Sequence, residues 1–256
     1  MIVKTRAVVL RELKYRDQSK ICLLMTREFG QISVILKAGR NPKSRLSGLF
    51  TVGNIVDAVI YRRSTRDIQL ASDASLVLSP LSQAPDLDRF GVLYRVLDLA
   101  RHSSGPEEKN LPLYTLLSST IERLCAEEED FLPVLAGFLL RLVGVLGFAP
   151  SIDRCVFSGR DLLQSIDGME ELHFVHDPGG FALPGTATSY GVQMQAVPAS
   201  RYMLIREIAT KGVSTQSSPQ KEVAAVCDLL QEYCSRHLDR MPHRKHLDVV
   251  SRIMTV

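Results

Sequence analysis

The chain has 256 residues, of which 45% are hydrophobic and 23% charged, and its formal net charge is +3. This composition is that of a folded globular protein of one or two domains, which excludes wholesale disorder, a collagen-like chain and a polytopic membrane protein. Residues 1–70 carry 14 Lys and Arg against 5 Asp and Glu, whereas residues 71–187 carry 8 against 17. A basic first domain before an acidic middle indicates nucleic acid as a partner, although a solvated charged surface gives the same counts.

Five cysteines are scattered along the chain, and Lys4 and Arg6 interrupt its first apolar run. The interruption argues against a secretory signal, and an odd number of unclustered thiols is typical of a reducing compartment. We therefore expect a cytoplasmic protein.

The first eighty residues predict five short β-strands. Apolar and β-branched runs bounded by turn residues occur at 2–10, 21–26, 31–36, 52–61 and 68–78. They lack βαβ spacing, which favours a small closed barrel, and the OB-fold is a five-stranded barrel that binds nucleic acids. We predict an OB-fold nucleic-acid-binding domain over residues 1–80.

Two loops of this predicted barrel are strongly basic. The candidate DNA-binding residues are Lys37, Arg40, Lys43 and Arg45 after the third strand, and Arg62, Arg63 and Arg66 between the last two strands. If the loops lie on one side of the barrel, they form a cationic rim that displaces counterions from DNA phosphates. Because aromatic residues are few, phosphate contacts are expected to dominate over base stacking. The alternative for each of these cations is a solvated loop.

Helical periodicity replaces the strand pattern after Pro80. Asp86 is predicted to cap a first helix, apolar residues at three- and four-residue steps predict helices near 113–124 and 131–147, and Ser218-Pro219 is predicted to begin the last helix. Residues 150–190 show neither period. The predicted fold class is α+β: the barrel, a helical domain in two parts (81–149 and 191–256), and a small irregular insert at 150–190.

The segment from Phe131 to Ala149 is apolar enough to be tested as a membrane span. Its single charge, Arg141, would lie near the bilayer centre, and its upstream flank is acidic. Both features disfavour insertion. We predict a buried helix and no membrane contact, with Arg141 reaching a protein partner or, as is more frequent, an acidic side chain of the same chain.

Several motifs resemble those of the bacterial RecO family of recombination mediators. They are Met1-Ile2-Val3-Lys4-Thr5, Ser19-Lys20-Ile21, Thr26-Arg27-Glu28-Phe29-Gly30, Lys37-Ala38-Gly39-Arg40 and Leu146-Gly147-Phe148-Ala149-Pro150. Their order matches the predicted barrel, helices and insert over roughly the whole chain.

The resemblance implies a role in DNA repair and recombination in the RecF pathway, without enzymatic activity. It implies binding of single- and double-stranded DNA, annealing of complementary strands, and loading of RecA, together with RecR, onto DNA coated by the single-strand-binding protein. The helical region would receive the acidic C-terminal tail of that protein, and Arg141 is the candidate residue. The alternative is an OB-fold adaptor that binds RNA or DNA with a different protein partner.

The chain departs from the RecO family at its zinc module. The family often carries two C-x-x-C pairs, which form a tetrahedral zinc site. Here the first pair reads Cys155-Val156-Phe157-Ser158 and the second Leu183-Pro184-Gly185-Thr186. Hydroxyls are poor zinc ligands, so we predict no metal, no cofactor and an apolar cluster that holds the insert. Cys155, His173 and His176 are an alternative metal set, which would make the protein a metal-dependent enzyme.

Overall fold

The structure is a computed structural model, and it describes residues 1–41, 43–126, 130–186, 193–211 and 219–238. The described chain forms two compact units, with the division between Phe131 and Leu132. The division falls inside the predicted helical domain 81–149, so the first two helices belong to the same unit as the barrel.

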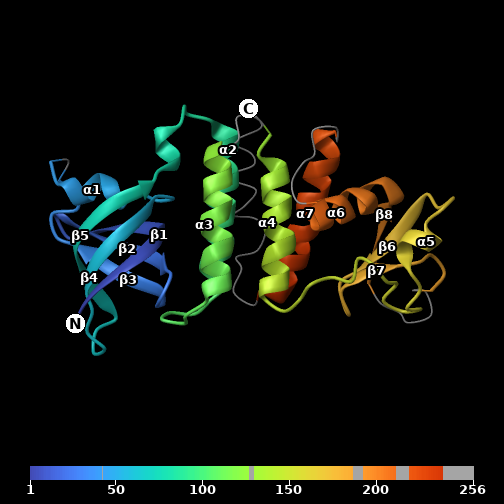
Figure 1. The fold of residues 1–256 in the computed structure, drawn as a ribbon, viewed down its shortest axis with the longest axis horizontal. Helices are drawn as coiled ribbons and strands as arrows, with labels where there is room; N and C mark the ends of the chain where they lie inside the picture. The colour runs from blue at the N-terminus through green and yellow to red at the C-terminus, as the bar shows by residue number, and fades with distance from the viewer. Residues whose placement is uncertain (42, 127–129, 187–192, 212–218, 239–256) are drawn as a thin grey trace. The chain divides into compact units, whose positions relative to one another are not determined.

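A closed five-stranded barrel opens the first unit (Figure 1). Its strands are β1 (Ile2–Tyr15), β2 (Ser19–Thr26), β3 (Gly30–Leu36), β4 (Ile55–Tyr61) and β5 (Ile68–Leu78). β2 pairs antiparallel with β1 and β3, β4 pairs antiparallel with β1 and β5, and a parallel pairing of β3 with β5 closes the ring. The predicted OB-fold barrel is confirmed.

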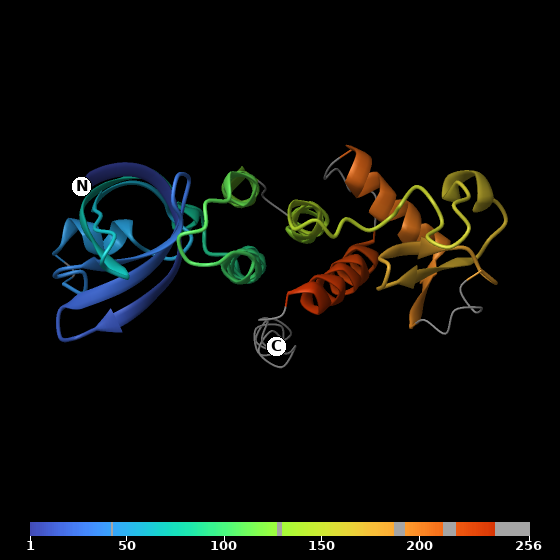
Figure 2. The same cartoon turned by 90° about the horizontal axis from the view of Figure 1, so that it is seen from below.

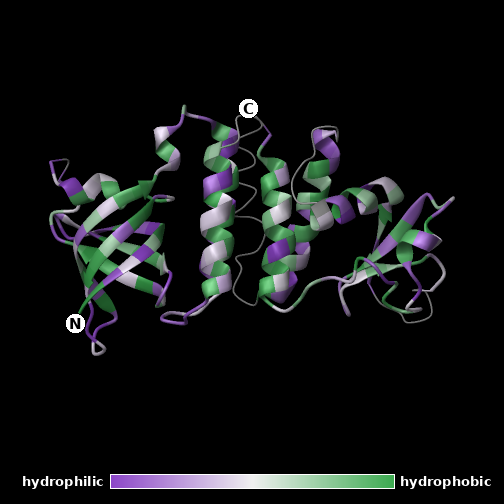
Figure 3. Cartoon of the chain, in the orientation of Figure 1, coloured by the Kyte–Doolittle hydropathy of each residue, from purple (hydrophilic) through white to green (hydrophobic). Residues whose placement is uncertain are grey.

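Alternation along the strands fills the barrel with apolar side chains. Leu24, Val34 and Ile60 are fully buried within one cluster to which all five strands contribute. The short helix α1 (Arg45–Leu49) joins β3 to β4, and Phe50, the residue after it, is fully buried in the same cluster. In Figure 3 the strands mix hydrophobic and hydrophilic residues, whereas the loops at the ends of the barrel are mostly hydrophilic. The core therefore holds a rigid ring from which polar loops project.

Two helices complete the first unit after a short 3-10 turn, η1 (Pro80–Ser82): α2 (Leu87–His102) and α3 (Leu111–Ala126). Figure 2 shows them end-on, side by side, next to the barrel. Asp86 caps α2 as predicted, because its carboxylate accepts a hydrogen bond of 2.9 Å from the backbone N–H of Arg89.

The start of β3 docks the barrel onto the segment that joins α2 to α3. Gln31 is buried, and its side-chain amide donates to the carbonyl oxygens of Arg101 (2.8 Å) and Ser104 (3.0 Å). Gly30 adopts a φ of +68°, and a Cβ at this position would clash with the carbonyl oxygen of Glu108. The barrel and these two helices are thus joined by backbone-level contacts.

The second unit contains α4 (Leu132–Val145), α5 (Leu162–Ser165), α6 (Ala199–Lys211), α7 (Gln220–His237) and a three-stranded antiparallel sheet. The strands are β6 (Glu171–Val175), β7 (Gly180–Ala182) and β8 (Met194–Pro198), in the order β7-β6-β8. The predicted insert, 150–190, is therefore not wholly irregular, because it contains α5, β6 and β7. Strands of three and five residues are too short for a period of two to be recognised, and β8 lies beyond the predicted insert.

The remaining helix predictions hold with small shifts. Pro219, and not Ser218, precedes the first residue of α7, and Ser218 lies outside the described residues. α4 has 14 residues, about 21 Å at 1.5 Å per residue. In the parts of the chain that the structure describes, none of the helices has the length and apolarity to cross a membrane.

Candidate nucleic-acid interface

The basic loop after β3 lies against the turn between β1 and β2. The backbone N–H of Arg40 donates to the carbonyl oxygen of Gln18 (3.0 Å). The guanidinium of Arg40 donates to the carbonyl oxygen of Arg16 (2.9 Å). The two loops together form what we call the basic loop cluster. It consists of the exposed residues Lys14, Arg16, Lys37, Arg40 and Lys43. Lys14 and Arg16 are not recognisable as part of this cluster from sequence, because only the pairing of the strands shows that their turn adjoins the loop.

A buried lysine fixes the shape of this cluster. The ammonium group of Lys20, only 7% exposed, pairs with Glu12 (2.8 Å) and donates to the carbonyl oxygens of Ser47 (2.9 Å) and Phe50 (2.9 Å). All three of its protons are therefore used. The bonds join the β1–β2 hairpin to α1, and Lys20 also pairs with Leu36 at the end of β3, so both ends of the loop between β3 and α1 are held.

Arg45 does not belong to this cluster. Its guanidinium forms an ion pair with Asp73 of β5, and it lines a different surface, on the outer face of the barrel. Because the pair neutralises it, Arg45 is a weaker candidate for phosphate binding than the five cations of the basic loop cluster, which have no acidic partner among the described residues.

The second predicted loop, between β4 and β5, keeps two of its three arginines exposed. Arg62 pairs with Glu107 (2.7 Å), and its guanidinium lies 4.9 Å from the ring centre of Phe29. Arg63 and Arg66 are exposed, and the buried amide of Gln69 holds the turn by donating to the carbonyl oxygens of both (3.0 and 2.6 Å). Arg62 is thus a docking residue, while Arg63 and Arg66 present their charges to solvent.

The two basic loops lie near opposite ends of β1. Ile2 pairs with Tyr61, just before the second loop, whereas Lys14 pairs with Lys20, which in turn pairs with Leu36, just before the first loop. The parallel pairing of β3 with β5 causes this separation. In parallel strands the end of β3 and the start of β5 lie at opposite ends of the pair. The two loops therefore do not form the single cationic rim expected if they lay on one side of the barrel.

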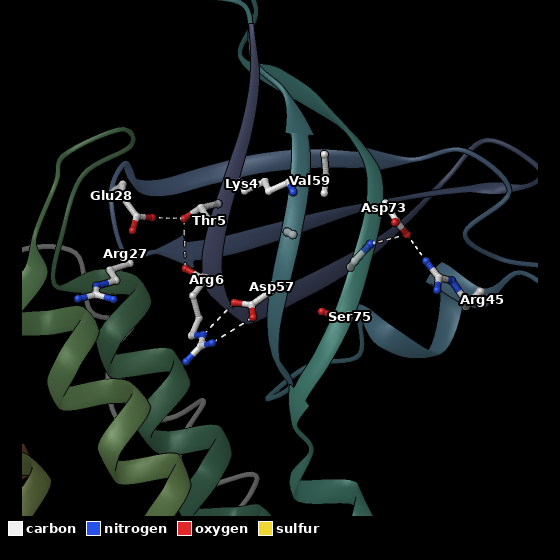
Figure 4. Close-up of a pocket in the computed structure, with 12 residues that line it drawn as sticks. Lys4, Thr5, Arg6, Arg27, Glu28, Arg45, Asp57, Val59, Asp73 and Ser75 are labelled. Carbon is white, nitrogen blue, oxygen red and sulfur yellow. Dashed lines mark hydrogen bonds and ion pairs between the residues drawn. The ribbon is translucent and has the colours of Figure 1, made fainter.

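The outer face of β1, β4 and β5 carries a hollow of about 570 Å³ (Figure 4). Arg6 forms a bidentate pair with Asp57 across it (2.8 and 3.0 Å), which lowers the pKa of that carboxyl below its usual value. Glu28 accepts a hydrogen bond from the hydroxyl of Thr5. The charges that line the hollow are mixed, in contrast to the basic loop cluster.

The zinc module implied by the RecO resemblance can be tested on its donor atoms. The sulfur of Cys155 accepts from the backbone N–H groups of Ser158 (3.5 Å) and Leu183 (3.4 Å), and it lies 3.7 Å from the hydroxyl oxygen of Thr186. The two segments that correspond to C-x-x-C pairs under the resemblance thus meet, but they offer one thiol, two hydroxyls and an alkyl group. This set does not fit a tetrahedral zinc ion.

Cys155 is instead held by hydrogen bonds. Burial raises the pKa of its thiol, but hydrogen bonds from Ser158 and from the backbone N–H of Leu183 outweigh burial and lower the pKa to about 7. The alternative set of Cys155, His173 and His176 is not assembled: among the residues described, no three His, Cys, Asp or Glu side chains are placed to hold a metal. The metal-enzyme hypothesis loses its site.

Arg141 lies on α4 in the second unit and is exposed, not buried as its helix predicted. It forms no ion pair with any other residue in the described ranges. Its neighbours Leu139, Leu142 and Val143 are buried, so Arg141 marks the outward side of an otherwise buried helix. Its role as a partner-binding residue stays a prediction.

An OB-fold barrel with exposed basic loops, followed by helices and a small sheet, defines a modular OB-fold protein. Comparison with family models identifies one family over nearly the whole chain. Residues 1–80 match the model Recombination protein O N terminal, and residues 84–247 match Recombination protein O C terminal. The chain belongs to the RecO family of DNA repair proteins, which confirms the resemblance seen in its motifs.

Full-length relatives agree with this family. The chain is 65% identical over 260 residues to the DNA repair protein RecO of Chlorobaculum parvum, with 100% of both chains covered. It is 53% identical to the RecO protein of Pelodictyon phaeoclathratiforme, with 99% of each covered, and 27% identical to that of Chloroherpeton thalassium, with 99% of this chain and 100% of the relative covered. Membership of the family implies a role in DNA repair and recombination.

Proposed function

We propose that this protein binds single- and double-stranded DNA through the basic loop cluster, without reading its sequence, and anneals complementary strands. The observation that carries the proposal is the contact of Arg40 with the β1–β2 turn, which gathers five exposed cations on one end of the barrel. Lys and Arg that neutralise phosphates release counterions, so binding weakens steeply with salt. Annealing requires contacts of this kind because the base edges must stay free to pair.

As a family member, the protein is proposed to load RecA, together with RecR, onto DNA coated by the single-strand-binding protein. It would act in the cytoplasm as a mediator and not as an enzyme. The exposed Arg141 on α4 is the proposed contact for the acidic C-terminal tail of the single-strand-binding protein, because a guanidinium pairs well with carboxylates. The DNA-binding and partner-binding groups then lie in different units of the chain.

The test is strand annealing with a double charge reversal in the cluster. Lys37→Glu combined with Arg40→Glu is expected to slow annealing of naked and of protein-coated strands by about tenfold or more, since two phosphate contacts become repulsive. A matched variant, Lys109→Glu with Lys221→Glu, changes net charge equally at two exposed lysines outside the cluster and is expected to anneal like the wild type.

Equal annealing by the two variants would remove the cluster from the mechanism. Normal annealing of naked strands by the wild type, but none of strands coated by the single-strand-binding protein with RecR present, would favour the alternative of an OB-fold adaptor with another partner.

A further inference from the structure

A second, smaller cavity lies within the first unit, where the barrel meets α3. Its volume is about 150 Å³. Arg6 and Arg27 line it from the barrel, and Tyr114 and Ser118 line it from α3. Arg6 and Arg27 also line the 570 Å³ hollow on the outer face of the barrel, so the two spaces share these side chains.

The hydroxyl of Tyr114 is an unsatisfied polar group at this cavity. Tyr114 is 5% exposed, and its buried oxygen has no hydrogen-bond partner among the residues that the structure describes. Burial raises its pKa to about 12, so the hydroxyl keeps its proton at neutral pH and can donate. Buried hydroxyls are nearly always hydrogen-bonded in folded proteins, so a free one beside a cavity points to a ligand.

Arg27 supplies the positive charge of this position, and Arg6, whose charge is balanced by Asp57, supplies a fixed hydrogen-bond donor. Asp57 engages Nε and one terminal nitrogen of Arg6, which leaves the other terminal nitrogen available and fixes the side chain in place. Arg27 is exposed and forms no ion pair with a described residue. In Figure 4 both side chains extend toward the helices, on the same side of the hollow. Arginine only donates hydrogen bonds, so these groups and the tyrosine hydroxyl favour an acceptor with negative charge.

The acidic residues nearby do not occupy this position. Glu28 is engaged by Thr5, and Asp57 by Arg6. Glu122 also lines the cavity, but it follows Tyr114 by eight residues on the same helix, which places it about 12 Å further along the axis. Glu122 acts on Arg6 through its charge. Beside Tyr114, the carboxylates of Glu28 and Asp57 are already engaged, and the tyrosine hydroxyl keeps its donor unused.

We propose that Arg6, Arg27 and the hydroxyl of Tyr114 form a subsite for one phosphate of the nucleic-acid backbone. The cavity holds the volume of about five water molecules, enough for a tetrahedral oxyanion but too little for a base. The adjoining hollow lies in the size range of sites that hold a small organic molecule, so it accommodates the attached nucleotide. The inference rests on the proposed DNA binding and adds a defined position for the backbone beside α3.

The experiment measures binding of a fluorescein-labelled oligothymidylate by anisotropy over a series of salt concentrations. Tyr114→Phe removes only the hydroxyl and is expected to weaken binding about five- to tenfold, with the salt slope unchanged because no charge is lost. Arg27→Ala is expected to weaken binding and to reduce the slope of log K against log salt by about 0.7, the value for one phosphate of a single strand. The matched control is Tyr94→Phe, at an exposed tyrosine of α2, which is expected to bind like the wild type.

Thermal unfolding keeps the result interpretable. Because the Tyr114 hydroxyl has no partner in the described chain, Tyr114→Phe is expected to unfold at the same temperature as the wild type or higher. A lower unfolding temperature would show that the hydroxyl makes a structural bond, which would overturn the assignment.

A second arm uses inorganic phosphate alone, with chloride at equal ionic strength as reference. If phosphate raises the unfolding temperature of the wild type but not of Tyr114→Phe, while DNA affinity is equal in both, the subsite binds free phosphate and the inference fails. It also fails if the wild type binds DNA and both variants match it in affinity and slope. Absence of wild-type DNA binding at low salt would instead reject the proposed function.

Discussion

The cations expected to contact DNA depend on buried polar residues that never reach it. Lys20 uses all its protons on Glu12 and two carbonyls at the end of α1, and Gln69 holds the turn that carries Arg63 and Arg66. Buried groups with a full set of partners have one stable geometry, since any displacement leaves an unpaired polar atom. At the scale of the residue, the shape of both basic loops is set from inside.

His176, in the second unit, is a residue whose protonation opposes folding. It is buried, its ring lies edge-on to Phe174 at 5.4 Å, and its Nδ1 atom has no partner among the described residues. Burial lowers its pKa below the usual value, and the positive charges of Arg236 and His237 lower it further, against an opposite effect of Glu232. The protonated form is therefore less stable in the folded chain than in the unfolded one.

We predict that stability falls below neutral pH because of His176. The pKa of His176 in the folded chain lies below the unfolded value of about 6.5. The stability that neutral His176 contributes is therefore complete above about pH 6.5 and is lost as the pH falls through the folded-state pKa. His176→Phe keeps an aromatic ring but cannot be protonated. The unfolding temperature, measured between about pH 8 and 5.5, is expected to fall more steeply in the wild type. Parallel curves for the two proteins would contradict this role.

At the scale of the element, prediction succeeded where the hydrophobic pattern was long. β5 begins and ends as predicted, and Asp86 caps α2. β1 continues to Tyr15, five residues beyond its predicted end. The prediction ended too early because Arg11–Tyr15 are all exposed and show no apolar alternation. Backbone hydrogen bonds to β2 extend the strand over these residues, and such bonds do not depend on which side chains are present.

That the small sheet module binds no zinc is also a prediction at this scale. The two segments in which the RecO resemblance implies zinc ligands meet at Cys155, whose sulfur is satisfied by backbone N–H groups. A chelator is therefore expected to leave the unfolding temperature unchanged. Combining Ser158→Cys, Leu183→Cys and Thr186→Cys restores four thiols, and elemental analysis is expected to find one zinc ion per chain.

The control for this metal experiment is Thr186→Cys alone, which supplies two thiols and is expected to bind no stoichiometric zinc. Destabilisation of the wild type by the chelator would show that the module retains a metal. Failure of the triple variant to take up zinc would show that the two segments no longer meet in the required geometry.

At the scale of the whole molecule, the sequence shows which loops are basic but not how their residues are grouped. The seven basic loop residues were recognisable from composition, whereas the separation of the two loops follows from the parallel pairing of β3 with β5. Tyr114 and Arg27 gave no signal at all, because their relation exists only once α3 packs beside the barrel. Contacts between distant segments are what a single sequence conceals.

The separation of the loops makes a prediction about the length of DNA bound. For single strands, each phosphate contact contributes about 0.7 to the slope of log K against log salt. On an oligonucleotide of about 4 nucleotides, the lower end of the range covered by one OB-fold, Lys37→Gln with Arg40→Gln is expected to reduce the slope by about 1.4. Arg63→Gln with Arg66→Gln is expected to leave it unchanged, because so short a strand does not span the 14 residues of β1.

On a strand several times longer, both double variants are expected to reduce the slope, and their combination to reduce it by about 2.8, the sum of the two effects. Additivity would show that one strand passes from the basic loop cluster to the β4–β5 turn along the outer face of the barrel. If Arg63→Gln with Arg66→Gln leaves the slope unchanged on the long strand as well, the second loop lies outside the DNA path, and the cluster around Arg40 alone provides the loop contacts to the backbone.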